Sequence, residues 1–418
     1  MNKPWNATYL RDGKLQICYY MYIDTLSETR KESVELNGTR KETLERVIEW
    51  RRHLHRYPEL SYAEKETSAF VARHLEAMGW RVRTGVGGHG VVADLDGGGG
   101  SGKRIALRAD MDALPIQDQK RAEYASTVPG VMHACGHDGH TAALLGAAER
   151  LADERAAWSG SVRLLFQPAE EMPPGGAQAM IEDGALEGVD EIYGIHLWSQ
   201  FPACTVHTAP GPLMAASDEF TLRIVGKGGH GGLPHQAIDA VAIGSHFVVN
   251  VQSIVSRNTD PILPNVISIG SFHAGTTFNV IASECRMEGT VRTMTPESRT
   301  HARARLEQVL QATCGMFGAE YELDYQFGYP PVVNHAEPTE RVLSLSRERF
   351  GDANVNVCQP LMAGEDFAYY LERVPGCFLF VGAGNDEVKA PHHHPLFDID
   401  ERALETSVDL LFDLATKR

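Results

Sequence analysis

The chain has 418 residues, of which 43% are hydrophobic and 22% charged, a composition typical of a folded globular protein. One ordinary hydrophobic core does not extend over so long a chain, so we expect two domains. The formal net charge of −16 argues against nucleic acid or an anionic membrane as the main partner. No apolar run reaches the roughly 18–20 residues of a membrane-spanning helix, and no secretion signal is recognisable. The seven cysteines are scattered without a Cys-x-x-Cys pair, so we expect a cytoplasmic protein.

From about residue 41 to about residue 216, predicted helices and strands alternate. The first 38 residues show no clear period, so we expect a loosely packed N-terminal extension there. Ser61 and Glu64 have the spacing of a capping box, which predicts the start of a helix that Gly79 would end. The predicted helices are 41–56, 61–78 and 139–157, and the predicted strands are 80–83, 91–95, 105–109, 162–167 and 191–198. Such an alternation predicts an α/β sheet covered by helices.

Between residues 217 and 330 the predicted order changes to strand, helix, strand, strand, helix, strand. These elements are 219–225, 237–256, 266–272, 285–292, 296–317 and 321–327. This is the order of the split βαβ or ferredoxin-like sandwich, a compact α+β unit. The α/β pattern then resumes with a strand at 377–381 and a helix from residue 401. We therefore predict a mixed-sheet catalytic domain formed by residues 39–216 and 331–418, with an inserted satellite domain at 217–330.

Acidic, histidine or thiol side chains occur in five short segments that we expect at the ends of predicted strands. They are RADMDALP (108–115), HACGHDGH (133–140), FQPAEE (166–171), IHLW (195–198) and HHHP (392–395). The carboxyl ends of strands in an open α/β sheet converge on one crevice, so these distant segments can meet there. Taken alone, each segment is better explained by a hydrogen-bonded histidine or a solvated glutamate pair. Their coincidence is what indicates a catalytic site.

Together these segments resemble the dinuclear-metal amidohydrolase and peptidase family that includes aminoacylases, hippurate hydrolase and plant indole-acetyl-amino-acid hydrolases. The resemblance runs from RRHLHRYPELSYAE (51–64) to HHPLFDIDE (393–401) and implies a zinc-peptidase-like domain with an inserted lid or dimerisation domain. It also implies two divalent ions per subunit, with Cys135 as the bridge, His137 and His196 on one ion, and Glu171 and His393 on the other. These donors suit Zn²⁺ or Mn²⁺, with Co²⁺ or Ni²⁺ also compatible. His133 and His140 would support the ligands or the fold.

Several assignments within these motifs depend on the resemblance. The family pattern His-x-Pro-x-(Phe/Tyr) selects His393 among three consecutive histidines. The resemblance also makes Glu170 the general base, whereas residue types alone do not separate it from Glu171. Asp112 would orient a ligand imidazole, although a helix-capping or turn aspartate fits equally well. Glu365 in MAGEDFAYY would either line the substrate pocket or stand at the start of a helix.

The inserted segment contributes a second set of residues that the resemblance points to. His230 in GKGGHGGLPH would stabilise the oxyanion of the tetrahedral intermediate, and Asn279 and Arg292 would hold the substrate carboxylate. For Arg292, a salt bridge on the face of a strand is an almost equally good explanation. We expect hinge closure near 216–218 and 328–332, or delivery of His230 from a partner subunit.

The resemblance implies hydrolysis of the amide bond of an N-acyl-L-amino acid, releasing a carboxylic acid and a free amino acid. A dipeptidase or an aminobenzoyl-glutamate-type hydrolase would use the same machinery, so both remain open. Outside enzymes, the alternative is an inactive homologue that binds metal or amino-acid conjugates, and the presence of Glu170 argues against it. The expected partner is a small-molecule substrate, and the strand edges of the satellite domain are compatible with a homodimer or tetramer.

Overall fold

The computed structural model describes the backbone of residues 28–417 and the side chains of residues 41–417. Among the described residues, 28–43 and 44–417 belong to two separate units. Helix α1 (Glu28–Arg56) begins earlier than the predicted helix 41–56, so it takes up part of the predicted loose extension. The remainder of that extension, residues 1–27, lies outside the described residues. The helix ends before Tyr57-Pro58, because a residue that precedes proline disfavours the helical conformation.

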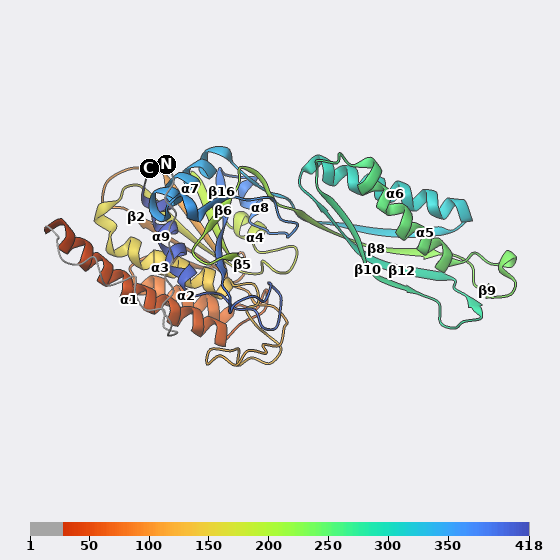
Figure 1. Ribbon diagram of the computed structural model, residues 1–418, viewed down its shortest axis with the longest axis horizontal. Coiled ribbons are helices and arrows are strands. Elements are labelled where there is room, and N and C mark those ends of the chain that lie inside the picture. The colour runs from red at the N-terminus through yellow and green to blue at the C-terminus, as the bar shows by residue number, and fades with distance from the viewer. Residues whose placement is uncertain (1–27, 418) are drawn as a thin grey trace, which may run out of the picture. The chain divides into compact units, whose positions relative to one another are not determined.

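A mixed sheet of eight strands organises most of residues 44–418 (Figure 1). Its order is β1-β2-β4-β3-β5-β16-β6-β15. The strands are β1 (Arg81–Val86), β2 (Gly90–Asp96), β3 (Arg104–Asp110), β4 (Ser161–Gln167), β5 (Glu191–Pro202), β6 (Val206–Thr208), β15 (Val355–Val357) and β16 (Gly376–Gly384). Strands β4, β3, β5 and β16 are mutually parallel, whereas β1, β2 and β6 pair antiparallel with β2, β4 and β16. The predicted α/β class with a mixed sheet is confirmed.

Helices cover both faces of this sheet. Two apolar clusters result, one with α2 (Lys65–Ala77), α3 (His137–Asp153), α7 (Ala336–Phe350) and α9 (Arg402–Thr416), the other with α4 (Ala177–Glu182) and α8 (Ala368–Leu371). The close packing of α3 depends on Gly146, where an added Cβ would come within 2.4 Å of Val47 and 2.9 Å of Val408. Because α3 is held so tightly, His137 at its first position is held with it.

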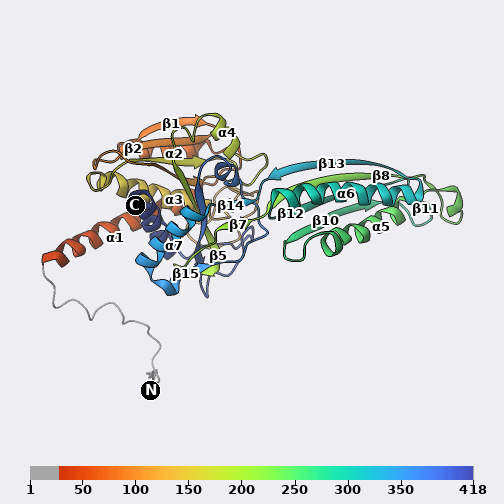
Figure 2. The same cartoon turned by 90° about the horizontal axis from the view of Figure 1, so that it is seen from above.

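Residues 216–329 form a second, antiparallel sheet with two helices. The sheet has the order β10-β12-β8-β13, with β8 (Ala216–Val225), β10 (Asn265–Ala274), β12 (Glu284–Thr293) and β13 (Glu320–Tyr329). Helices α5 (Ala240–Ser253) and α6 (Pro296–Phe317) lie on one face of it, as Figures 1 and 2 show. Alternate residues of β8, such as Phe220 and Leu222, are buried in the core under these helices. The chain order of these elements is the one predicted for the ferredoxin-like unit.

Two two-stranded sheets accompany the larger ones in the described part of the chain. Strand β7 (Gly211–Met214) pairs with β14 (Val332–Asn334), and β9 (Gly229–His230) pairs with β11 (Val280–Ile281).

The predicted capping box at Ser61 and Glu64 is wrong. Helix α2 begins at Lys65, and the Ser61 hydroxyl instead donates a 2.7 Å hydrogen bond to Asp112. A bond to a buried carboxylate is stronger than an exposed cap. Within residues 28–417, none of the helices combines the length and apolar character that a bilayer crossing requires.

Candidate metal centre and active site

The five predicted segments meet at one edge of the large sheet, although only two of them follow strand ends. Segments 108–115 and 166–171 continue from β3 and β4 as predicted. Segment 133–140 instead leads into α3, and 392–395 lies in the loop before α9. His196 lies inside β5. The last residue pair between β3 and β5 is Arg108 with Gly194, and β5 continues past it, so His196 reaches the same edge.

The structure brings the five predicted metal ligands together. The Sγ atom of Cys135 lies 3.6 Å from Nε2 of His196. The Nε2 atom of His393 lies 3.4 Å from one carboxylate oxygen of Glu171, and that of His137 lies 3.8 Å from the other. Two groups of donor atoms result, each within 4.8 Å: Cys135 with His137 and His196, and Cys135 with Glu171 and His393. Cys135 belongs to both groups, which is the arrangement expected of a bridging ligand.

The chemistry of this cluster fits a pair of cations. Within the described part of the chain, Nε2 of His137 and Oε1 of Glu171 are buried without a hydrogen-bond partner. Burial raises the pKa of the Cys135 thiol well above its ordinary value, and nearby carboxylates, Glu171 first, raise it further. Burial lowers the pKa of His137, but the carboxylates of Asp110 and Asp112 outweigh burial and raise that pKa to about 10. Buried lone pairs and excess negative charge are what bound cations would neutralise.

Asp112 supports two of these ligands at once. Its main-chain oxygen and its Oδ1 lie 2.9 and 3.2 Å from Nδ1 of His137, so Nδ1 carries the hydrogen and Nε2 is left facing the cluster. Its Oδ2 accepts hydrogen bonds from the main-chain N–H of Glu171 at 2.9 Å and from the Ser61 hydroxyl at 2.7 Å. This is the position expected of a residue that orients a ligand imidazole.

The two remaining histidines of segment 133–140 differ in their contacts. His140 links Asp110, 2.6 Å from its Nδ1, to the main-chain N–H of Leu197, which donates to its Nε2 at 2.8 Å. It thereby fixes β5 next to His196. His133 is buried, and neither of its ring nitrogens has a partner among the described residues. Burial lowers the pKa of His133 to about 3.

A buried charge cluster lies behind Glu170, and sequence reasoning missed it. Arg108 is 2% exposed, and its guanidinium donates hydrogen bonds of 2.6 to 3.0 Å to Asp110, Gln167, Glu365 and Asp366. Burial raises the pKa of Glu170 well above its ordinary value, and the carboxylates of Glu365 and Glu171 raise it further. An arginine inside an otherwise apolar strand was the available signal, since a buried guanidinium requires several acceptors.

Glu365 belongs to this charge cluster. Besides Arg108, it accepts a 2.9 Å hydrogen bond from the main-chain N–H of Phe367, and it is 1% exposed. In the described part of the chain it is not among the residues that line the pocket. The short helix α8 begins three residues further on, at Ala368. The structure therefore places Glu365 behind Glu170.

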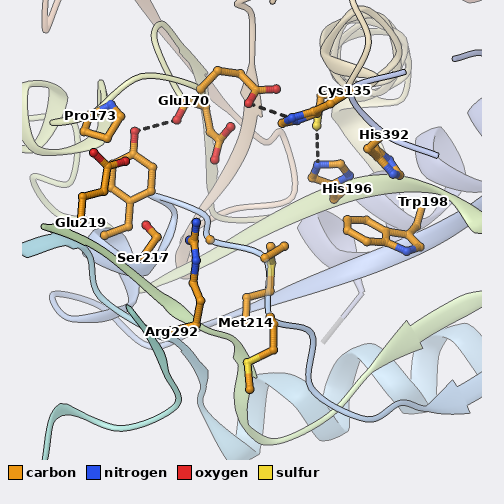
Figure 3. Close-up of a pocket in the computed structure, with 16 residues that line it drawn as sticks. Cys135, Glu170, Pro173, His196, Trp198, Met214, Ser217, Glu219, Arg292 and His392 are labelled. Atoms are coloured by element: carbon orange, nitrogen blue, oxygen red, sulfur yellow. Dashed lines mark hydrogen bonds and ion pairs between the residues drawn. The ribbon is translucent and has the colours of Figure 1, made fainter. Parts of the chain in front are cut away.

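The ligand cluster opens into a pocket of about 400 Å³ (Figure 3). Part of its wall is apolar and is formed by Trp198, Met214 and Met362. The second sheet contributes Ser217, Glu219 and Arg292 to the wall. Figure 3 shows Arg292 pointing from its strand toward the side of the pocket that carries Glu170 and His196. The guanidinium of Arg292 forms no hydrogen bond or ion pair with any described residue. The salt bridge on the strand face that was considered for Arg292 is therefore not formed.

His230 and Asn279 do not lie with the ligand cluster. They line a different pocket, together with His273, where β9 and β11 pair. The main-chain N–H of Gly231 donates a 2.8 Å hydrogen bond to the carbonyl of Asn279, so the two predicted residues are close to each other. His230 is exposed. Of the second predicted set, the structure brings only Arg292 to the ligands.

Comparison with known proteins agrees with this geometry. Residues 106–417 match the sequence profile described as peptidase family M20/M25/M40. YhaA of Bacillus subtilis is 48% identical over 393 residues, which cover 94% of this chain and 98% of YhaA. The N-acyl-L-amino acid amidohydrolase of Geobacillus stearothermophilus is 47% identical over 295 residues, covering 71% and 80% of the two chains. The crystal structure of Bacillus subtilis YxeP, described as a dinuclear metal-binding M20 peptidase, superposes with a TM-score of 0.78 at 36% identity, covering 90% and 98%.

Proposed function

The chain belongs to peptidase family M20/M25/M40, and from this membership we propose that it is a metal-dependent hydrolase of N-acyl-L-amino acids. The single observation that carries the proposal is the joint position of Cys135, the acidic pair Glu170–Glu171 and Arg292 in one pocket. Water activation and recognition of a carboxylate are thereby available at the same place. An N-acyl amino acid offers both an amide and a free carboxylate.

We assign the cations to the five clustered donors: Cys135, His137, Glu171, His196 and His393. Two divalent ions held there, Zn²⁺ or Mn²⁺ in preference to Co²⁺ or Ni²⁺, would supply Lewis-acid polarisation of the amide and a lower pKa for water. The imidazoles are prepared for this role, since Asp112 fixes the tautomer of His137. Hydrolysis then depends on how the remaining residues move protons and hold the substrate.

Glu170 is our choice for the general base. It lies in the pocket beside Glu171, and its raised pKa means that it readily holds a proton. It would take one proton from the attacking water and pass it to the nitrogen as the carbon–nitrogen bond breaks. Arg108 behind it supplies fixed positive charge, which holds Glu365 and Asp366 in place beneath the base.

Arg292 and His230 have different tasks in this proposal. Arg292 would hold the α-carboxylate by a bidentate contact, for which a guanidinium is well shaped. His230 would stabilise the oxyanion, and to do so it must reach the ligand cluster by closure at 216–218 and 328–332 or from a partner subunit. We accordingly treat residues 39–216 with 331–418, and residues 217–330, as two domains that move as units.

The test is metal analysis together with hydrolysis of N-acetyl, N-benzoyl and indole-acetyl amino acids beside dipeptides. Glu170→Gln should retain bound metal and lose about 10²–10⁴-fold in kcat, the range for loss of general-base catalysis. Glu182→Gln, on the outer helix α4, is a matched control that should retain activity. Hydrolysis of the best substrate by Glu170→Gln at the wild-type rate would show that another group is the base. Preferential hydrolysis of dipeptides would instead indicate a dipeptidase.

A further inference from the structure

The outer face of the second sheet, which α5 and α6 leave uncovered, carries charged side chains whose pairing changes along the strands. Away from the pocket, Arg223 forms ion pairs of 2.9 Å with Glu284 and with Glu322. At the pocket, Glu219 and Arg292 line the wall, and neither forms a hydrogen bond or ion pair with any residue in the described part of the chain. The charge of Arg223 is therefore neutralised outside the pocket, whereas those of Glu219 and Arg292 are available to a ligand inside it.

The strand register places these two available charges side by side without joining them. Arg292 lies opposite Ser217 in the β8–β12 pair, and Glu219 lies opposite Thr290. Glu219 and Arg292 are therefore diagonal neighbours on one face, a relationship that separates side chains by about 7–8 Å. Figure 3 shows both side chains in the same pocket. A ligand the size of one amino acid can contact the cation and the anion together.

We propose that Glu219 selects substrates whose amino-acid part has a cationic side chain, such as lysine or ornithine. This inference rests on the proposed function, because Arg292 is taken to hold the α-carboxylate. With that carboxylate on Arg292, the side chain on the same Cα can extend along β8 to Glu219, and the acyl group is left to the apolar wall of Trp198. An acidic side chain would meet Glu219 as a like charge, whereas an ammonium would form a charge-assisted hydrogen bond.

The experiment compares kcat/KM for N-acetyl-L-lysine, N-acetyl-L-norleucine and N-acetyl-L-glutamate in the metal-loaded protein. Norleucine has a chain of similar length to lysine but no ammonium. We expect lysine to exceed norleucine about three- to tenfold, as for a half-exposed ion pair, and glutamate to be the poorest. Glu219→Gln should reduce the lysine-to-norleucine ratio toward one, and Glu219→Lys should reverse the order of lysine and glutamate. Glu288→Gln, on the same sheet face outside the pocket, should leave the ratio as it is.

The proposed function and the role of Glu219 have separate readouts. Hydrolysis of N-acetyl-norleucine reports the proposed function, whereas the lysine-to-norleucine ratio reports Glu219. An unchanged ratio in Glu219→Gln, with norleucine hydrolysed, overturns the role of Glu219 alone. If no N-acyl amino acid is hydrolysed, the proposed function fails. In that case calorimetric binding of free L-lysine and L-norleucine to wild type and Glu219→Gln still decides for or against the selection.

Discussion

The hydroxyl of Tyr329 donates a 2.7 Å hydrogen bond to the main-chain carbonyl of Glu170. Tyr329 is the last residue of β13, and Glu170 lies in the loop that follows β4. The contact, drawn as a dashed line at Glu170 in Figure 3, therefore fastens the end of the second sheet to the loop of the proposed base. Because Tyr329 lies within the proposed hinge at 328–332, movement of the hinge would shift the main chain of Glu170.

Removing this hydroxyl should slow the reaction more than it destabilises the fold. Tyr329→Phe should lower kcat by about two- to tenfold, the loss expected when one hydrogen bond no longer holds the base, with KM changed less. Tyr369→Phe is the matched control, because its hydroxyl lies 3.4 Å from the carbonyl of Gly328 and does not contact Glu170. Steady-state kinetics on N-acetyl-norleucine measures both. Equal kcat in wild type and Tyr329→Phe would show that the contact does not position the base.

Metal removal should cost stability as well as activity. The buried carboxylates and unpartnered His137 Nε2 are left uncompensated without cations. Ligand binding stabilises a fold by about 2.7 kcal/mol at a hundredfold excess over Kd, so chelation should lower the thermal midpoint by several degrees. Atomic emission should find two ions per chain after reloading with Zn²⁺ or Mn²⁺. A midpoint insensitive to chelation would contradict the assignment of the cluster as a metal centre.

Arg51 is predicted to set the spacing between two ligand segments. Its guanidinium is fully buried and donates to Asp138, next to His137, at 2.8 Å and to Asp398, on the chain that follows His393, at 2.7 Å. Lysine cannot bridge both carboxylates with a planar fork, so Arg51→Lys should weaken binding of one ion about 10- to 100-fold. Isothermal titration with Zn²⁺ measures this.

The neighbouring Arg52 supplies the control for that experiment. It pairs with Glu401 at 2.7 Å and is half exposed, so Arg52→Lys should leave both affinities near wild type. Two unaltered zinc affinities in Arg51→Lys, in a protein with native circular dichroism, would show that the arginine serves only the fold.

The sequence predicted most of the architecture because its apolar periodicity and glycine positions are local signals. Helix 296–317 agrees with α6 (Pro296–Phe317), where Thr295 caps the helix through the main-chain N–H of Ser298. The capping box at Ser61 failed, because a tertiary bond to Asp112 overrode the local preference. Helix α7 was missed, since its start follows a short strand and carries proline at its third position.

The candidate site was predictable to the extent that its residues lie in short motifs. The side chains of all five predicted ligands lie close together in the structure, and their role as metal ligands stays a prediction. The contacts of Arg108 and Arg51 were not predictable, because each joins segments far apart in the sequence. The separation of His230 from the ligands is what the expected hinge closure, or delivery from a partner subunit, presupposes; its pairing partner β11 was not predictable, because no local pattern encodes the β9–β11 pair.

His207 should make the fold less stable in mild acid. It is buried in β6 and stacks on Phe201 with ring centres 4.0 Å apart, and burial lowers its pKa below the ordinary value of 6.5. Unfolding therefore takes up a proton below about pH 6.5, so this contribution is fully present above pH 6.5 and is lost as the pH falls. Urea unfolding at pH 7.5 and 5.5 should show a smaller difference in His207→Gln than in wild type. The exposed His235→Gln should match wild type, and an equal difference in all three proteins would contradict the prediction.

Arg292 should determine the affinity for carboxylate substrates. Its guanidinium faces the pocket without a partner among the described residues, and burial lowers its pKa, with Glu219 and Asp218 opposing this. A charge-assisted bidentate contact contributes about 1.5–3 kcal/mol, so Arg292→Ala should raise KM for N-acetyl-norleucine about 10- to 100-fold. In the same variant, KM for N-acetyl-norleucine should approach KM for its amide, because the guanidinium that distinguishes a carboxylate from an amide has been removed. Arg223→Ala, an arginine of the same sheet face that is already paired, controls for the loss of positive charge. If KM for the carboxylate substrate is unchanged in Arg292→Ala, another residue holds the carboxylate. The register of β8 and β12 would then not explain how the substrate is recognised.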